Sequence, residues 1–141
     1  MSAATARRYY VRGNTEMGRG EYEAAAESFR AAMDLHPGFV SARLSYAVAL
    51  GRQGDSPRAA QVLRAGLARE ERKRPRAMLF LSLGDTLIAG GDFQGAEDAF
   101  KQAKELVPGL AAAEAGLARV HARLGRYSES FAALLLAARA K

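Results

Sequence analysis

The sequence contains no cysteine and no tryptophan among its 141 residues. The lack of cysteine excludes disulfides, thiolate metal sites and cysteine nucleophiles. No apolar run comes close to the roughly 20 residues that are needed to cross a bilayer. The N-terminal segment also lacks the apolar stretch of a secretory signal. We therefore expect a cytoplasmic protein without a membrane span.

Residues that carry chemistry are equally scarce. The two histidines, His36 and His121, have no nearby ligand set or nucleophile partner in the sequence. Glycines cluster at residues 18–20 and 90–95, but no strand precedes either cluster, so we interpret both as turns rather than phosphate-binding loops. We expect no catalytic residue, no metal site and no cofactor, and we predict that the protein is not an enzyme.

What the sequence does contain is the composition of a folded protein and an internal repeat. Hydrophobic residues make up 49% and charged residues 26% of the chain, a balance typical of one folded domain. Similar segments recur at nearly equal intervals, and each contains a glycine where a turn is expected. These turn glycines are Gly20, Gly54, Gly91 and Gly125.

Each turn glycine precedes a run with helical periodicity. An aromatic residue usually follows the glycine, at Tyr22, Phe93 and Tyr127. Small and bulky residues then alternate at steps of three and four residues, as at Ala96 and Phe100. The pattern predicts a helix, a tight turn and a second helix, four times over.

This pattern resembles the tetratricopeptide repeat family, whose unit is a helix–turn–helix of about 34 residues. The best match is the third unit, which carries Phe80, Leu83, Gly84, Leu87, Gly91, Ala96, Phe100, Ala103 and Pro108. The resemblance implies an all-α fold: a right-handed α-solenoid of four hairpins and eight helices. We predict a single domain over residues 1–141, with units at about 6–39, 40–76, 77–110 and 111–141.

Two departures from the family pattern carry predictions. Arg12 and Glu16 replace apolar residues in the first helix, so we expect them on a polar outer face of an end unit. The second unit is slightly longer than the others, and its extra residues fall within 68–76. We expect its second helix to extend to near Arg74, before Pro75.

In this family the first helices line a concave groove, and the resemblance implies candidate partner-binding residues there. The groove is expected to be apolar at its centre, with Arg and Asn at its margins. Such a groove suits a peptide or protein with apolar anchors and acidic flanks. The alternative is that residues such as Leu44, Val48 and Leu81 simply pack against neighbouring units. The candidates are Arg7, Tyr10, Asn14, Met17, Leu44, Val48, Arg52, Met78, Leu81, Asp85, Ile88, Arg119 and Arg123.

Some family members clamp the C-terminal carboxylate of a chaperone with Lys, Arg and Asn on the first helices. Asn14 matches one clamp position. The other positions hold Tyr10, Ser45, Met78 and Ser82. We therefore expect no chaperone-tail clamp.

The net charge of +6 is concentrated in the second unit, where basic residues far outnumber acidic ones. One interpretation is a docking patch for an anionic partner such as nucleic acid. The favoured interpretation is a solvated helix end, where the helix dipole stabilises cations. The residues concerned, called the basic segment below, are Arg69, Arg72, Lys73, Arg74 and Arg76.

The last helix carries apolar residues with few charges, including Phe131, Leu134 and Leu135. They indicate either self-association into a homo-oligomer or a longer chain that continues beyond Lys141. The alternative is that isolated exposed leucines are normal on any surface.

Our leading hypothesis is a non-enzymatic protein–protein interaction module with a scaffold, assembly or chaperone-like role. The alternative function is binding of nucleic acid or another polyanion through the basic segment. The apolar character of the predicted groove disfavours that alternative, because helical-repeat RNA readers use polar base-reading residues there.

Overall fold

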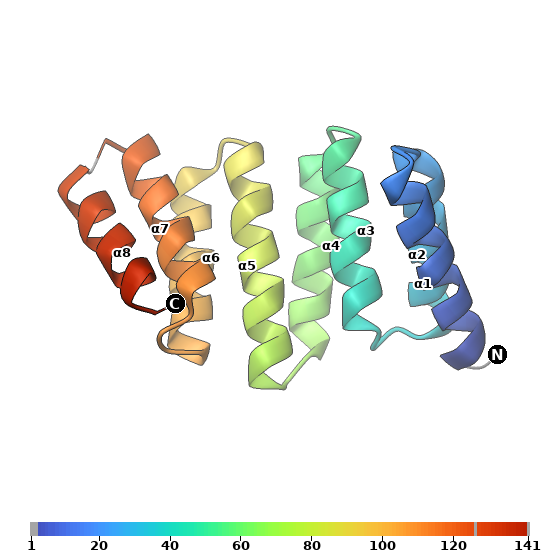
Figure 1. Ribbon diagram of the computed structural model, residues 1–141. Helices are drawn as coiled ribbons and strands as arrows, with labels where there is room; N and C mark the ends of the chain where they lie inside the picture. Colours follow the sequence, from blue (N-terminus) through green and yellow to red (C-terminus); the bar gives the residue numbers. More distant parts are fainter. Residues whose placement is uncertain (1–2, 126, 141) are drawn as a thin grey trace. The chain divides into compact units, whose positions relative to one another are not determined.

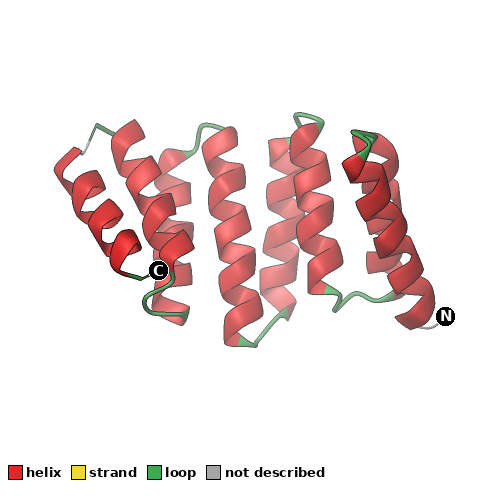
Figure 2. Ribbon diagram, viewed as in Figure 1, coloured by secondary structure: helices red, strands yellow, loops and turns green. Residues whose placement is uncertain are grey.

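A computed structural model describes the backbone of residues 3–125 and 127–140, and the side chains of residues 127–130 lie outside that description. Figure 2 shows helices joined by loops, with no strand in the described part of the chain. The chain divides into two compact units, Met1–Glu70 and Glu71–Lys141. The single domain over residues 1–141 stays a prediction, and each unit is described by itself.

Unit 1 consists of two helical hairpins. Its helices are α1 (Ala3–Gly18), α2 (Tyr22–Leu35), α3 (Val40–Arg52) and α4 (Ser56–Arg69). Each helix packs against the next, and the first helices α1 and α3 also touch (Figure 1).

Unit 2 repeats this arrangement. Its helices are α5 (Lys73–Ala89), α6 (Phe93–Leu106), α7 (Ala111–Arg123) and α8 (Tyr127–Arg139). Successive helices pack together, and α5 touches α7 (Figure 1). The prediction of an all-α helical repeat with four hairpins is confirmed for the described residues.

The turn glycines lie where the repeat predicts them. The four glycines have φ between 76° and 84°, the left-handed region that a residue with a side chain enters only at a cost. At Gly54 this conformation lets the amide of Asp55 donate to the carbonyl of Leu50 over 2.9 Å. Gly20 and Gly91 of the two glycine clusters therefore lie in turns between helices, as expected, whereas Gly95 lies within the first turn of α6.

The core of each unit is built on one phenylalanine that lies against a helical glycine. Phe29 of α2 lies against Gly13 of α1, and Phe100 of α6 lies against Gly84 of α5. Both rings are almost fully buried. A helix without a side chain at this point lets its neighbour approach closely, so the ring fills the interface.

The expected extension of the helix before Pro75 is wrong. Helix α4 ends at Arg69, and the extra residues lengthen the start of α5 instead. Pro75 lies in the first turn of α5. Amides of a first turn have no intrahelical acceptor, so a residue without an N–H is tolerated there.

The polar outer face expected on α1 is only half right. The side chain of Arg12 is 67% exposed, but that of Glu16 is 12% exposed. Glu16 accepts a hydrogen bond from Ser28 of α2. Its carboxylate therefore belongs to the packing between α1 and α2 rather than to the outer face.

Helix length and hydropathy leave no candidate for a transmembrane helix in the residues that the structure describes.

Candidate functional site

The first helices of unit 1 carry seven of the predicted groove residues, and none of the seven is buried. Tyr10 and Leu44 are half-buried, whereas Val48 is 45% exposed. We call this set the α1/α3 surface: Arg7, Tyr10, Asn14, Met17, Leu44, Val48 and Arg52. It combines apolar side chains with arginines at its ends.

Tyr10 has a packing role as well as a surface. Its ring centroid lies 5.0 Å from that of Phe39 and 5.9 Å from that of Phe29. Tilted rings at these separations attract each other. Tyr10 therefore joins the first hairpin to the start of the next while one side of it remains accessible.

The first helices of unit 2 carry the other six predicted residues, and again none is buried. This α5/α7 surface consists of Met78, Leu81, Asp85, Ile88, Arg119 and Arg123. Met78 is 49% exposed. Leu81 packs against the buried cluster of Ala77, Ala103 and Ala113, so it contributes to packing as well as to the surface.

An ion pair joins the two helices of the α5/α7 surface. A guanidinium nitrogen of Arg119 lies 2.7 Å from Asp85 Oδ1, with both side chains more than half exposed. The guanidinium also lies 5.7 Å from the centroid of the Phe100 ring. Asp85 thus partly neutralises Arg119, which was expected to face the acidic flanks of a partner.

The outermost arginines of the two surfaces lie against aromatic rings of the second helices. Arg52 lies 5.8 Å from the Tyr22 centroid, and Arg123 lies 5.9 Å from the Phe93 centroid. The two pairs occupy equivalent positions in the two units. Cation–π contacts of this kind hold both arginines at the turn end of their hairpins.

The basic segment does not sit at one helix end. Arg69 lies in the last turn of α4, whereas Lys73, Arg74 and Arg76 lie in the first turn of α5. The helix dipole favours a cation only at the first of these places. The dipole argument for a merely solvated helix end therefore fails for most of the segment.

The predicted self-association residues are exposed on α8. Phe131 is 65%, Leu134 55% and Leu135 49% exposed, while Ala133 and Ala137 on the opposite side are buried. Helix α8 packs on α7 through that side. Nothing in the described residues covers the outer side.

Unit 2 contains a buried polar cluster that the sequence pattern did not predict. His121 Nε2 lies 2.7 Å from Glu97 Oε2, and both side chains are buried. A second buried carboxylate, Glu114, lies 3.0 Å from Lys104 Nζ. In register, Glu97 and His121 replace Ala26 and Leu50 of unit 1. That comparison was the signal, because a carboxylate at a buried alanine position needs a partner.

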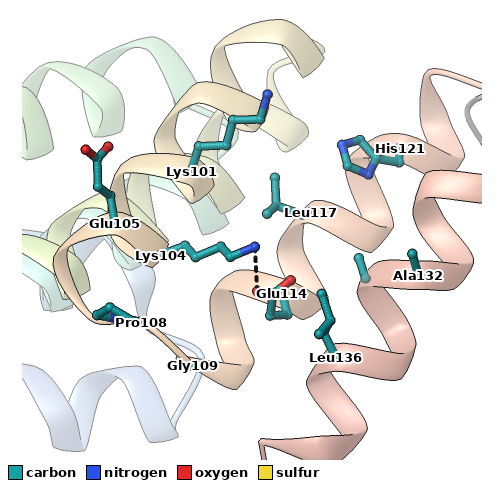
Figure 3. Close-up of a pocket in the computed structure, with 11 residues that line it drawn as sticks. Lys101, Lys104, Glu105, Pro108, Gly109, Glu114, Leu117, His121, Ala132 and Leu136 are labelled. Carbon is teal, nitrogen blue, oxygen red and sulfur yellow. Dashed lines mark ion pairs between the residues drawn. The ribbon is translucent and has the colours of Figure 1, made fainter.

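A cavity of about 530 Å³ lies beside this cluster, between α6, α7 and α8. Figure 3 shows Lys101 and Lys104 on α6, Glu114, Leu117 and His121 on α7, and Leu136 on α8 around it. The Lys104–Glu114 ion pair crosses the space between α6 and α7 (Figure 3). The apolar part of the wall comes mainly from α7 and α8.

At the position of unit 1 that is equivalent to Glu114, Arg43 is buried. Arg43 donates to the carbonyl of Val62 over 3.0 Å and to that of Pro37 over 3.3 Å. Burial, and then the charge of Arg69, lower the pKa of Arg43 below its ordinary value. These contacts make Arg43 part of the packing between α3 and α4 rather than of the α1/α3 surface.

Among the described side chains, those of residues 3–125 and 131–140, no group of three potential metal ligands occurs. His36 lies beside Phe39, with ring centroids 5.4 Å apart. His121 lies in the buried cluster described above.

A family model described as tetratricopeptide repeat matches residues 10–75, 47–111 and 81–141. No curated protein sequence matches the chain.

Solved structures share the fold at low identity. TTC0263, a thermophilic TPR protein from Thermus thermophilus, matches with a TM-score of 0.81 and 21% identity, over 96% of this chain and 74% of that one. MamA 41-end from Desulfovibrio magneticus RS-1 matches with a TM-score of 0.78 and 18% identity, over 96% and 75%. The first TPR of Spaghetti (RPAP3), bound to the HSP90 peptide SRMEEVD, matches with a TM-score of 0.76 and 19% identity, over 89% and 97%.

Proposed function

Because the chain belongs to the tetratricopeptide repeat family, we propose that it is a non-enzymatic module that binds a partner protein through its first helices. The observation that carries the proposal is the exposure of apolar residues there. Val48 and Met78 remain about half exposed. The α1/α3 and α5/α7 surfaces to which they belong also carry arginines. Exposed apolar anchors with charged margins are typical of peptide-binding surfaces.

The partner that fits is a segment with apolar anchors and acidic flanks. On the α1/α3 surface, Val48 supplies an apolar contact and Arg7 a cation at the margin. On the α5/α7 surface, Met78 and Ile88 supply apolar contacts and Arg119 a cation. Binding of this kind suits a scaffold, assembly or chaperone-like role, which we propose for the cytoplasm.

We do not propose that this chain binds the same kind of peptide as the RPAP3 domain. That peptide ends in the sequence EEVD, and the family's clamp for such a chain end uses Lys, Arg and Asn side chains. Of the clamp positions that the family resemblance implies, only Asn14 matches. The others hold Tyr10, Ser45, Met78 and Ser82, none of which is cationic. We therefore propose recognition of an internal segment rather than of a chain end.

A displayed library of random peptides tests this function. The selected peptides are expected to share apolar anchors and acidic flanks. They should lose binding to the variant Val48→Glu/Met78→Glu, because each new carboxylate repels the flanks and disrupts an apolar contact. These two positions are better probes than Leu44 and Leu81, which are half-buried.

The matched control is Gln61→Glu/Gln102→Glu, which adds the same charge at exposed positions of the second helices α4 and α6. Peptides that bind both variants equally well would show that the first helices are not the site. Circular dichroism establishes that each variant is folded.

A second candidate is polyanion binding by the basic segment. It is favoured by the cations at the start of α5, which the helix dipole does not stabilise. A short single-stranded RNA should then bind with steep salt dependence. Binding should fall in Arg72→Glu/Arg74→Glu and persist in Val48→Glu/Met78→Glu. Failure of RNA to bind even at low salt would remove this candidate.

A further inference from the structure

Helix α8 differs from the other second helices at the positions that face outward. In register, Leu134 corresponds to Phe29, Leu63 and Phe100. Those three side chains are at most 1% exposed, whereas Leu134 is 55% exposed. Phe100 is covered by α7, where Gly116 lies against its ring. The same site on α8 has no covering helix in the described residues.

A missing neighbour does not account for the whole apolar surface. Leu135 corresponds to Arg30, Arg64 and Lys101, which are all exposed and charged. Solvent reaches that position in the other second helices, yet α8 places a leucine there. A partner that covers Leu134 and Leu135 together must therefore lie differently on α8 than α7 lies on α6.

These residues form one continuous strip. Phe131, Leu134, Leu135 and Ala138 recur at steps of three and four, which places them on one side of the helix. We call them the α8 strip. All four are exposed, and the strip itself carries no charge.

The strip is complementary to itself in one arrangement. When two α8 helices pair antiparallel about a two-fold axis between Leu134 and Leu135, each Leu134 opposes Leu135 of the second copy. Phe131 then opposes Ala138 of the second copy, so the largest side chain meets the smallest. Large-against-small packing of this kind is what close helix pairs need.

Head-to-tail stacking is disfavoured by the other end of the chain. The positions of α1 equivalent to Ala113 and Leu117, which are buried on α7, hold Arg8 and Arg12, and both are exposed. Stacking α1 on α8 of another copy would desolvate two guanidinium groups. A two-fold pair closes, whereas head-to-tail contacts would generate an open filament.

We propose that the chain forms an antiparallel two-fold dimer through the α8 strip. This assembly is separate from the first-helix surfaces and does not depend on the proposed function. It removes an apolar strip from water and uses none of the residues of the α1/α3 and α5/α7 surfaces.

Light scattering coupled to size exclusion tests the association. Wild type should elute as a dimer that dissociates on dilution. Leu134→Glu places two carboxylates together at the centre of the pair, so the dissociation constant should rise by at least about 100-fold. The matched control, Val11→Glu, changes an exposed apolar residue of α1 and should leave the dimer intact. A wild-type monomer at high concentration would overturn the proposal.

Single cysteines test the orientation, because the natural chain has none. A mixture of Phe131→Cys and Ala138→Cys chains should oxidise to mixed dimers, while each variant alone should crosslink poorly. Parallel pairing would instead link each variant to itself. If the strip binds only a different protein, no variant would crosslink. Either result would overturn the proposal. Circular dichroism of the variants shows whether α8 still folds.

Discussion

The ring of Phe100 occupies the space that a side chain on Gly84 would need. A Cβ added to Gly84 would lie 2.5 Å from Phe100 Cζ, well inside contact distance. The two helices of this hairpin therefore approach as closely as their backbones and one aromatic ring allow.

Gly84→Ala should destabilise the protein by about 1–3 kcal/mol, because the added methyl group overpacks the interface. Gly51→Ala is the control. Its Cβ would meet no atom within 4 Å, so the helix gain of up to about 1 kcal/mol should stabilise the protein slightly. Urea unfolding followed by circular dichroism measures both. Equal effects of the two substitutions would contradict the close approach.

The buried pair of Glu97 and His121 should be replaceable as a unit. Glu97→Ala alone leaves a buried imidazole nitrogen without its 2.7 Å contact and should cost about 1–3 kcal/mol. The double variant Glu97→Ala/His121→Leu reproduces the Ala26 and Leu50 of unit 1. It should recover most of that loss, because an apolar pair needs no partner. A double-mutant cycle of unfolding free energies measures the coupling. Additive losses would show that the two side chains are independent.

Breaking the ion pair of Asp85 and Arg119 should affect binding more than stability. Both side chains are more than half exposed, so Asp85→Asn should change the unfolding free energy by less than about 1 kcal/mol. The freed guanidinium should raise affinity for a selected acidic peptide, by up to about fivefold. Fluorescence anisotropy measures it. A version of the same peptide without acidic residues should bind wild type and variant alike.

The position of a charged residue along its helix determines whether a charge substitution raises or lowers the stability of the protein. Arg74 lies in the first turn of α5, so Arg74→Glu should stabilise the protein by about 0.3–1 kcal/mol at low salt. Arg139 lies in the last turn of α8, so Arg139→Glu should have the opposite sign. Thermal unfolding at low and high salt checks both effects. A loss of stability in Arg74→Glu would mean that its present contacts outweigh the dipole.

Much of the fold could be predicted from local pattern. Turn glycines such as Gly54 adopt a positive φ that few other residues adopt. Bulky and small residues that alternate at helical spacing predict two closely packed helices in a hairpin. The end of α4 could not be predicted in the same way. Pro75 is compatible with stopping one helix or with starting the next, and only packing chooses between them.

The candidate surfaces were predictable as far as exposure, but not as far as contacts. The register of the repeat placed Val48 and Met78 on accessible faces, since position along a helix determines which side is exposed. It could not show that Arg119 pairs with Asp85 or that Tyr10 packs on two rings. These contacts depend on how neighbouring helices meet, which a single helix does not encode.

The pairs Gly13–Phe29 and Tyr22–Arg52 of unit 1 recur in register in unit 2, as Gly84–Phe100 and Phe93–Arg123. The interval between the matching pairs covers two hairpins rather than one. A graft of a single hairpin would separate Tyr22 from Arg52, because the two residues lie in successive hairpins. The smallest piece of this chain that can be transplanted with its contacts intact is therefore a pair of hairpins.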